Sequence, residues 1–305
     1  MKRMRLIYAV LLVSVLGGPA AAASVDIAIG GRFWYNWWRP PWADGVTFAT
    51  PVTPDKPFST PYRIKHYRIN PAPMYGFIVS ARFLDTWFFS SSLMISRYST
   101  RSGTPPYGAI NSWPLLKNRL DINRYDFDAR LGYQANRYFR AFIYFKTKAY
   151  DYTLWTRLFQ ASPSPAYLAR SESEFIDVGP GLGIAVTVPL YQNFFMECEL
   201  AGLVNAGYAS RTYDYQYAIL DSGVSLILDK FDKESFYSFS GSGSLFLGYR
   251  IEPVNITIMA GGRYDISRYM HHRILRGFLD YNHKLDQSWG TTFSVVYGYT
   301  ATDGQ

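Results

Sequence analysis

Residues 121–135 read Asp-Ile-Asn-Arg-Tyr-Asp-Phe-Asp-Ala-Arg-Leu-Gly-Tyr-Gln-Ala, and this stretch decides the fold. From Arg124 to Arg130 every charged side chain falls on an even number, while the odd positions carry mostly apolar residues such as Phe127 and Leu131. Successive side chains of a β-strand point to opposite faces. The pattern therefore predicts a strand with one charged face and one apolar face.

The same alternation recurs along the chain in ten segments: 25–38, 73–83, 87–98, 121–135, 139–150, 174–188, 194–206, 236–249, 254–266 and 288–300. Each segment has ~10 residues or more, the length that a tilted strand needs to cross the hydrocarbon core of a bilayer. Short connections at 84–86, 136–138, 189–193 and 250–253 alternate with long ones at 39–72, 99–120, 151–173, 207–235 and 267–287. We therefore expect tight turns at one end of a barrel, together with both termini, and long loops at the other.

Charged residues within the segments keep to one face. Fifteen charged residues lie within the expected membrane spans, and in every segment with two or more of these fifteen, all share one parity. A soluble β-sandwich also alternates, but it does not require ten long strands with aromatic residues at both ends. The sequence thus predicts an all-β fold, a transmembrane antiparallel up-and-down β-barrel of about ten strands. Twelve strands remain open, because 211–219 and 223–229 could form an extra hairpin. The expected lumen charge network comprises Asp26, Arg32, Arg82, Arg124, Asp126, Asp128, Arg130, Arg140, Lys146, Lys148, Asp177, Glu197, Glu199, Arg263 and Asp265.

The first residues have the composition of a secretory signal peptide. Three basic residues precede the apolar run 6–16, and small residues follow at 20–23. The run is too short to span a bilayer, so we expect residues 1–23 to be cleaved and 24–305 to form the barrel. The formal charge of the whole chain is +8. Its basic residues are scattered rather than clustered, which argues against a nucleic-acid partner.

The last segment resembles the insertion signal of bacterial outer-membrane β-barrels. It reads Ser-Trp-Gly-Thr-Thr-Phe-Ser-Val-Val-Tyr over 288–297, with spaced aromatic and hydrophobic positions after the glycine. Residues 300–305 extend beyond the strand, where many members of the class end on an aromatic residue. The resemblance implies location in the bacterial outer membrane. The implied partners are outer-membrane lipid, lipopolysaccharide and the barrel-assembly machinery, and the oligomeric state stays open.

Candidate catalytic residues are scarce. The four histidines, at 66, 271, 272 and 283, form no spacing typical of a metal site, and we expect neither a cofactor nor an enzyme activity. Asp126 and Asp128 match the Asp-x-Asp spacing of the omptin-type outer-membrane proteases, but the Asp-x-His partner of that family is missing. Three functions remain: a narrow, weakly selective channel for small solutes, a plugged structural or surface-interaction barrel with ligand-binding loops, and, remotely, an omptin-like protease.

Register can be predicted for one hairpin. A turn at 136–138 pairs Ala135 with Phe139, which places Asp128 opposite Lys146 and Asp126 opposite Lys148. Directly opposed residues share a face, so we expect these two pairs to be ion pairs inside the barrel. The four serines at 238, 240, 242 and 244 are also expected to point inward. The stretch 268–286 is interpreted as a solvated loop, with contact to anionic lipid head groups as an alternative.

Overall fold

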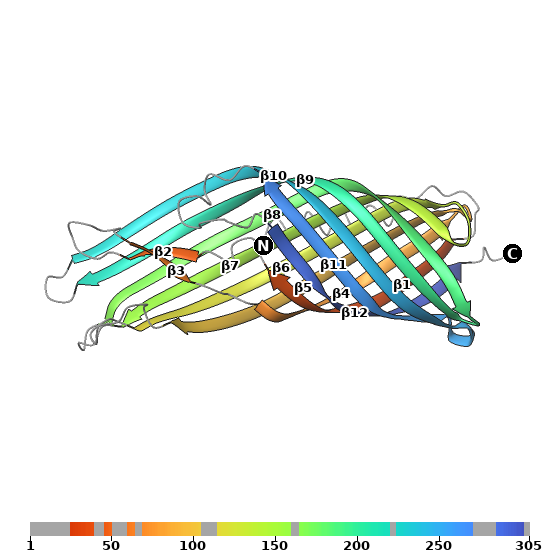
Figure 1. Ribbon diagram of the computed structural model, residues 1–305, viewed down its shortest axis with the longest axis horizontal. Coiled ribbons are helices and arrows are strands. Elements are labelled where there is room, and N and C mark those ends of the chain that lie inside the picture. The colour runs from red at the N-terminus through yellow and green to blue at the C-terminus, as the bar shows by residue number, and fades with distance from the viewer. Residues whose placement is uncertain are drawn as a thin grey trace.

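The computed structural model describes residues 25–39, 46–50, 60–64, 69–104, 115–159, 165–219, 224–270 and 285–301 (Figure 1). The barrel strands are β1 Val25–Arg39, β4 Ile69–Phe83, β5 Trp87–Thr104, β6 Leu115–Gln134, β7 Phe139–Phe159, β8 Pro165–Tyr191, β9 Phe194–Ile219, β10 Val224–Ile251, β11 Ile256–Met270 and β12 Leu285–Ala301. β2 (Val46–Thr50) and β3 (Thr60–Ile64) pair as a separate two-stranded sheet. The predicted signal peptide lies outside the described residues.

Each barrel strand pairs antiparallel with the barrel strand that follows it in the sequence. β1 pairs with β4 in this series, because β2 and β3 form their own sheet. β1 also pairs with β12, from Val25 opposite Ala301 to Arg39 opposite Gln287, and this seam closes the barrel. The prediction of an antiparallel up-and-down barrel is confirmed. The twelve-strand variant is wrong, because residues 211–219 and 224–229 are paired continuations of β9 and β10.

The two faces of the wall have opposite character, as the alternation predicts. Outward side chains are large and apolar: Ile143, Leu182 and Leu200 are 59%, 72% and 58% exposed. Inward side chains on the same wall are buried even where they are charged, and Arg124 is 0% exposed. An apolar exterior around a polar interior is the arrangement that a strand barrel needs in lipid. Among the described residues, no helix is long and apolar enough to cross a membrane.

Tight turns gather at one end, which we call the turn end, and the opposite end is the loop end. Leu84, Asp85, Gln192 and Asn255 take left-handed backbone conformations there, with φ between 47° and 59°. Asn136 accepts hydrogen bonds from the backbone N–H groups of Tyr138 and Phe139, both at 2.8 Å. Asn side chains stabilise turns in this way. β11 begins at Ile256 rather than at 254, because Glu252–Val254 form a 3-10 turn.

The long connections are shorter than the sequence indicates, because strands continue into them. β8, β9 and β10 have 27, 26 and 28 residues, whereas β1 and β11 have 15. The long strands project beyond the short ones at the loop end (Figure 1). Apolar alternation marks only the part of a strand whose outer face meets lipid. Beyond that zone the ladder continues without the pattern, which explains why residues 151–159 and 207–219 were expected to be loop.

A closed barrel with an apolar outer wall should behave as a membrane protein when it is purified. We expect the purified protein to need detergent, to give a β-rich circular dichroism spectrum, and to migrate faster on gels before boiling than after it. The reason is that the exposed apolar wall must be covered, while the closed ladder resists unfolding until it is heated. A monomeric product that stays soluble without detergent would contradict the fold.

Candidate functional site

The barrel interior is arranged in layers, and β7 passes through all of them. Alternate residues along this strand point inward, in the order Arg140, Phe142, Tyr144, Lys146, Lys148, Tyr150 and Tyr152 from the turn end toward the loop end. At a rise of ~3.3 Å per residue they cover about 40 Å along the strand. A cavity, an aromatic layer, a charged region and a second aromatic layer follow one another along this path.

The first charged layer joins one arginine, one lysine and two aspartates into one cluster. Arg263 on β11 contacts Asp128 on β6 at 3.0 Å and Asp265 on its own strand at 3.1 Å. Lys146 contacts Asp265 at 2.9 Å. The Tyr144 hydroxyl donates to Asp128 at 2.6 Å. These side chains are nearly inaccessible to solvent, so each charge depends on the others for its stabilisation.

Arg124 forms the centre of a second charged layer. Its guanidinium donates to both carboxylate oxygens of Asp126, at 2.9 and 2.6 Å, and to the Ser288 hydroxyl at 2.9 Å. It also lies over the rings of Trp38 and Trp34, 4.7 and 5.9 Å from their centroids. Bidentate pairing with a carboxylate is a geometry that the planar guanidinium of arginine provides and the ammonium of lysine does not.

Asp286 anchors the third charged layer. Its carboxylate accepts from Lys148 at 2.9 Å, from the Trp38 indole N–H at 2.8 Å and from the Tyr269 hydroxyl at 3.1 Å. Its side chain is 0% exposed. The expectation that 268–286 forms a loop is therefore wrong at both ends, since β11 continues to Met270 and β12 begins at Leu285 and directs Asp286 inward. Residues 271–284 lie outside the described part of the chain.

Two of these ion pairs connect opposite walls of the barrel. In the closed strand order, β6 and β11 are five strands apart in either direction, and so are β7 and β12. Arg263–Asp128 joins the first two strands at 3.0 Å, and Lys148–Asp286 joins the second two at 2.9 Å. The side chains thus meet across the full width of the lumen.

An aromatic cluster covers the charged region on the side of the loop end. Tyr150 and Phe236 both stack on Phe175, with ring centroids 4.4 and 4.9 Å from the Phe175 centroid. Tyr269 packs edge-on against Phe175 and Phe236, at 5.3 and 5.2 Å. Large rings exclude water efficiently, so the charges below them are shielded.

Three of the four inward serines of β10 donate hydrogen bonds to carboxylates. Ser238 donates to Asp177 at 3.0 Å, and Asn205 donates to the same carboxylate at 3.1 Å. Ser242 donates to Asp265 at 2.6 Å, and Ser244 donates to a Glu199 oxygen at 3.3 Å. Ser240 donates to Ser267. The predicted inward direction of the four serines is confirmed, and they act as hydrogen-bond donors in a filled interior.

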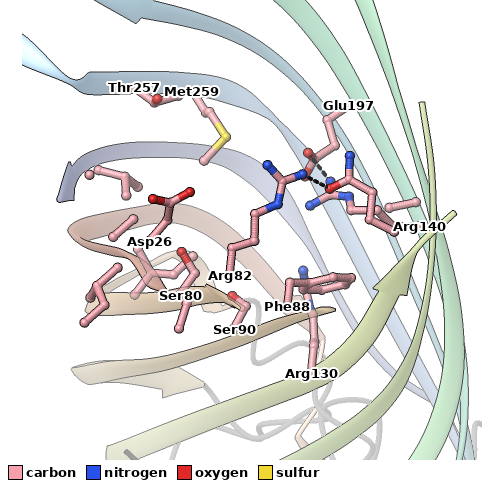
Figure 2. A pocket seen from close by; sticks show the side chains of 18 of the residues that line it. Asp26, Ser80, Arg82, Phe88, Ser90, Arg130, Arg140, Glu197, Thr257 and Met259 are labelled. Carbon is pink, nitrogen blue, oxygen red and sulfur yellow. Dashed lines mark hydrogen bonds and ion pairs between the residues drawn. The ribbon is translucent and has the colours of Figure 1, made fainter. Parts of the chain in front are cut away.

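A cavity of about 410 Å³ occupies the interior near the turn end (Figure 2). Its inner limit is the aromatic layer, where Phe142 packs against Phe88 and Tyr144. Two ion pairs lie in its wall: Arg130 with Glu199 at 2.6 Å, and Arg140 with Glu197. Arg82 projects into the space from β4 and donates to Gln134 (Figure 2).

The structure places all fifteen residues of the expected charge network inside the barrel, in two groups. The buried mid-barrel group is Arg124, Asp126, Asp128, Lys146, Lys148, Asp177, Arg263 and Asp265. The group lining the cavity is Asp26, Arg32, Arg82, Arg130, Arg140, Glu197 and Glu199.

The predicted register of the β6–β7 hairpin is confirmed, with Asp126 opposite Lys148 and Asp128 opposite Lys146. The predicted ion pairs are wrong. Asp126 pairs with Arg124 on its own strand, and Lys148 reaches across the lumen to Asp286. Long side chains in a narrow barrel contact the opposite wall as easily as the adjacent strand, and register alone does not choose between them.

Sequence reasoning missed the uncharged members of the interior. Trp34 and Trp38 share the inward parity of Arg32 on β1, a signal that could have identified them. Asn205 and Tyr269 follow the same rule on β9 and β11. The four histidines lie outside the described residues. Within the described ranges, no group of three or more His, Cys, Asp or Glu side chains is placed to hold a metal ion.

Comparison with known proteins gives likeness of fold only. No family model and no curated protein sequence matches the chain. The outer membrane protease OmpT from Escherichia coli is 12% identical, with a TM-score of 0.43 over 91% of this chain and 96% of that one. Ail from Yersinia pestis is 12% identical, with a TM-score of 0.30 over 92% and 100%.

The Pseudomonas putida toluene transporter TodX is 14% identical, with a TM-score of 0.26 over 95% of this chain and 93% of that one. None of these similarities assigns an activity. The class of fold follows instead from three features of the molecule itself: ten antiparallel strands closed by β1 and β12, an apolar outer wall and a charged interior. The chain is a closed, ten-stranded antiparallel β-barrel of the kind that crosses a membrane with its strands.

Proposed function

We propose that this protein is a sealed barrel, anchored in the outer membrane, that acts through the part of its wall rising above the lipid rather than as an open channel. The observation that carries the proposal is the pair of salt bridges across the lumen, Arg263–Asp128 and Lys148–Asp286. A pore that passes solutes needs binding that is weak enough for release and a continuous path. Ion pairs that span the lumen would bind their partners tightly and would interrupt a continuous path.

The strand lengths support a role at the loop end. Ten or so residues cross the membrane, and β8, β9 and β10 have more than twice that number. Their excess length forms a paired sheet outside the bilayer. A rigid scaffold that positions terminal loops is a common way to build a binding surface.

Planar-bilayer recording tests the seal. We expect the purified protein to insert without single-channel steps. Arg124→Ala should produce conductance steps, since it removes the guanidinium packed between Trp34 and Trp38 and leaves Asp126 unpaired. Arg119→Ala is the matched control, because Arg119 is exposed at the loop end of β6 and should leave the membrane silent. Steps from the unmodified protein would overturn the proposal.

The cavity favours one second candidate, a narrow and weakly selective channel for small solutes. It lies near the turn end, and its lining mixes both signs of charge. This function requires the mid-barrel charges to rearrange, so it predicts steps in the same recording. A protease receives no support from the described residues, because Asp126 and Asp128 are 2% exposed and held in ion pairs.

A further inference from the structure

We propose that the cavity at the turn end is a binding site for a small organic anion, a carboxylate or phosphate that carries an apolar ring or short chain. Its volume of about 410 Å³ falls within the ~300–1,000 Å³ of typical small-molecule sites. Such sites combine an apolar lining with a few placed polar groups. The proposal concerns the space below the mid-barrel charges and is independent of whether those charges seal the lumen.

The cavity lining carries more positive than negative side chains. Five arginines and three carboxylates line the cavity. Arg130 and Arg140 are matched by Glu199 and Glu197. The other three arginines and Asp26 have no ion pair among the residues that the structure describes. The lining therefore retains an excess of positive charge that its own carboxylates do not neutralise.

The partners of the three unmatched arginines are neutral oxygens. Arg32 donates to the Ser294 hydroxyl at 3.1 Å, and Arg250 donates to the Asn255 amide oxygen at 3.2 Å. Arg82 donates to the Gln134 amide oxygen and lies centrally in the space (Figure 2). A guanidinium has five N–H donors in a planar fork. Each of these groups therefore keeps donors for an incoming carboxylate or phosphate, which arginine binds in bidentate geometry.

The cavity lining also has an apolar part. Phe88, Phe142 and Phe246 line the cavity with Ile78 and Met259. The Arg140 guanidinium lies over the Phe88 ring at 5.5 Å, and the Arg130 guanidinium lies over the Phe142 ring at 5.6 Å. Inorganic phosphate alone would leave these surfaces in contact with water. A ligand with an anionic end and an apolar body satisfies both parts of the lining.

Access decides the source of the ligand. The cavity lies inside the closed strand ladder, so a lipid in the surrounding bilayer is separated from it by the hydrogen-bonded wall. Asp26, Arg250, Asn255 and Gly298 line it beside the strand ends and turns of the turn end. A soluble anion entering from that end reaches the arginines without crossing lipid.

Calorimetric titration of the detergent-solubilised protein with phenyl phosphate tests the inference. We expect saturable binding, with weaker binding of inorganic phosphate and of benzyl alcohol, which each lack half of the chemistry. The double variant Arg32→Gln/Arg82→Gln should bind phenyl phosphate at least about tenfold more weakly, because two charge-assisted contacts are lost. Arg119→Gln removes one positive charge far from the cavity and should bind as the unmodified protein does.

Heat-modifiable migration of each variant establishes that its barrel is closed before binding is compared. Equal affinity in the double variant and the unmodified protein would overturn the inference, as would absence of saturable binding to the unmodified protein. Equal binding of phenyl phosphate and inorganic phosphate would show a simple phosphate site and would overturn the organic part of the proposal.

Discussion

Lysine in place of Leu245 is expected to prevent most of the protein from assembling into the membrane. Leu245 is 52% exposed on the outer face of β10, about 20 Å along the strand from the turn that begins at Glu252. Because barrel strands tilt by ~35–45°, this length corresponds to ~15 Å of height, near the middle of an apolar band ~25 Å tall, where a basic residue on the lipid face costs ~2–4 kcal/mol. The measurement is the fraction of heat-modifiable protein recovered after refolding into lipid vesicles.

Ser244→Lys is the matched control, one residue away on the opposite face. Ser244 lies beside Glu199 in the lumen, so a lysine there meets a carboxylate and polar surroundings. We expect it to assemble far better than Leu245→Lys. Equal losses would mean that the assigned faces of β10 are wrong.

Replacing Arg263 with methionine should destabilise the folded barrel by about 3–5 kcal/mol, the typical cost of removing one partner from a buried ion pair. Arg263 contacts Asp128 and Asp265, so its loss leaves Asp128 without an ion pair and Asp265 with Lys146 alone. Denaturant unfolding in detergent, followed by tryptophan fluorescence, measures the change. A loss below about 1 kcal/mol, the range of an exposed surface pair, would contradict the buried network.

A second-site test separates the observed pairing from the one that the hairpin register indicates. Lys146→Met should also destabilise the barrel, since Asp265 loses its 2.9 Å contact. Adding Asp265→Leu should recover more of the loss than adding Asp128→Leu: both carboxylates keep their contact with Arg263, but only Asp265 loses an ion pair when Lys146 is replaced. The reverse order would favour ion pairing between adjacent strands.

The transmembrane fold was predictable because lipid imposes a rule on single residues. A charge on the outer face is so costly that Arg124, Asp126 and Asp128 had to share one parity, and that parity indicated the strand and its facing. The position of the turn at 136–138 then indicated the register of the hairpin. Turn positions followed from where the alternation breaks. These are local signals, and each can be recognised without knowing which strands lie opposite one another.

The contacts inside the barrel were not predictable in the same way. Lys148 faces Asp126 in register, yet its ammonium contacts Asp286, which is 138 residues away on the opposite wall. That choice depends on the tilt of the strands and the width of the lumen. Asp286 carried no signal of its own, because the alternation of the last strand becomes readable only from Ser288 onward. The cavity likewise results from the sizes of side chains on many strands.

The seam between β1 and β12 has a consequence for the order in which the barrel folds. β9 and β10 are joined by a short connection and can zip together locally, from Ile219 opposite Val224 to Phe194 opposite Tyr249. The seam instead brings the two ends of the chain together, and such distant contacts form slowly because ordering the intervening chain costs entropy.

Trp38 and Asp286 lie on either side of that seam and bond to each other at 2.8 Å. While the seam is open, the hydrogen bond between the Trp38 indole and the Asp286 carboxylate cannot form. Completion of the wall and satisfaction of the interior polar groups should therefore occur as one cooperative step, so that half-closed barrels are short-lived intermediates.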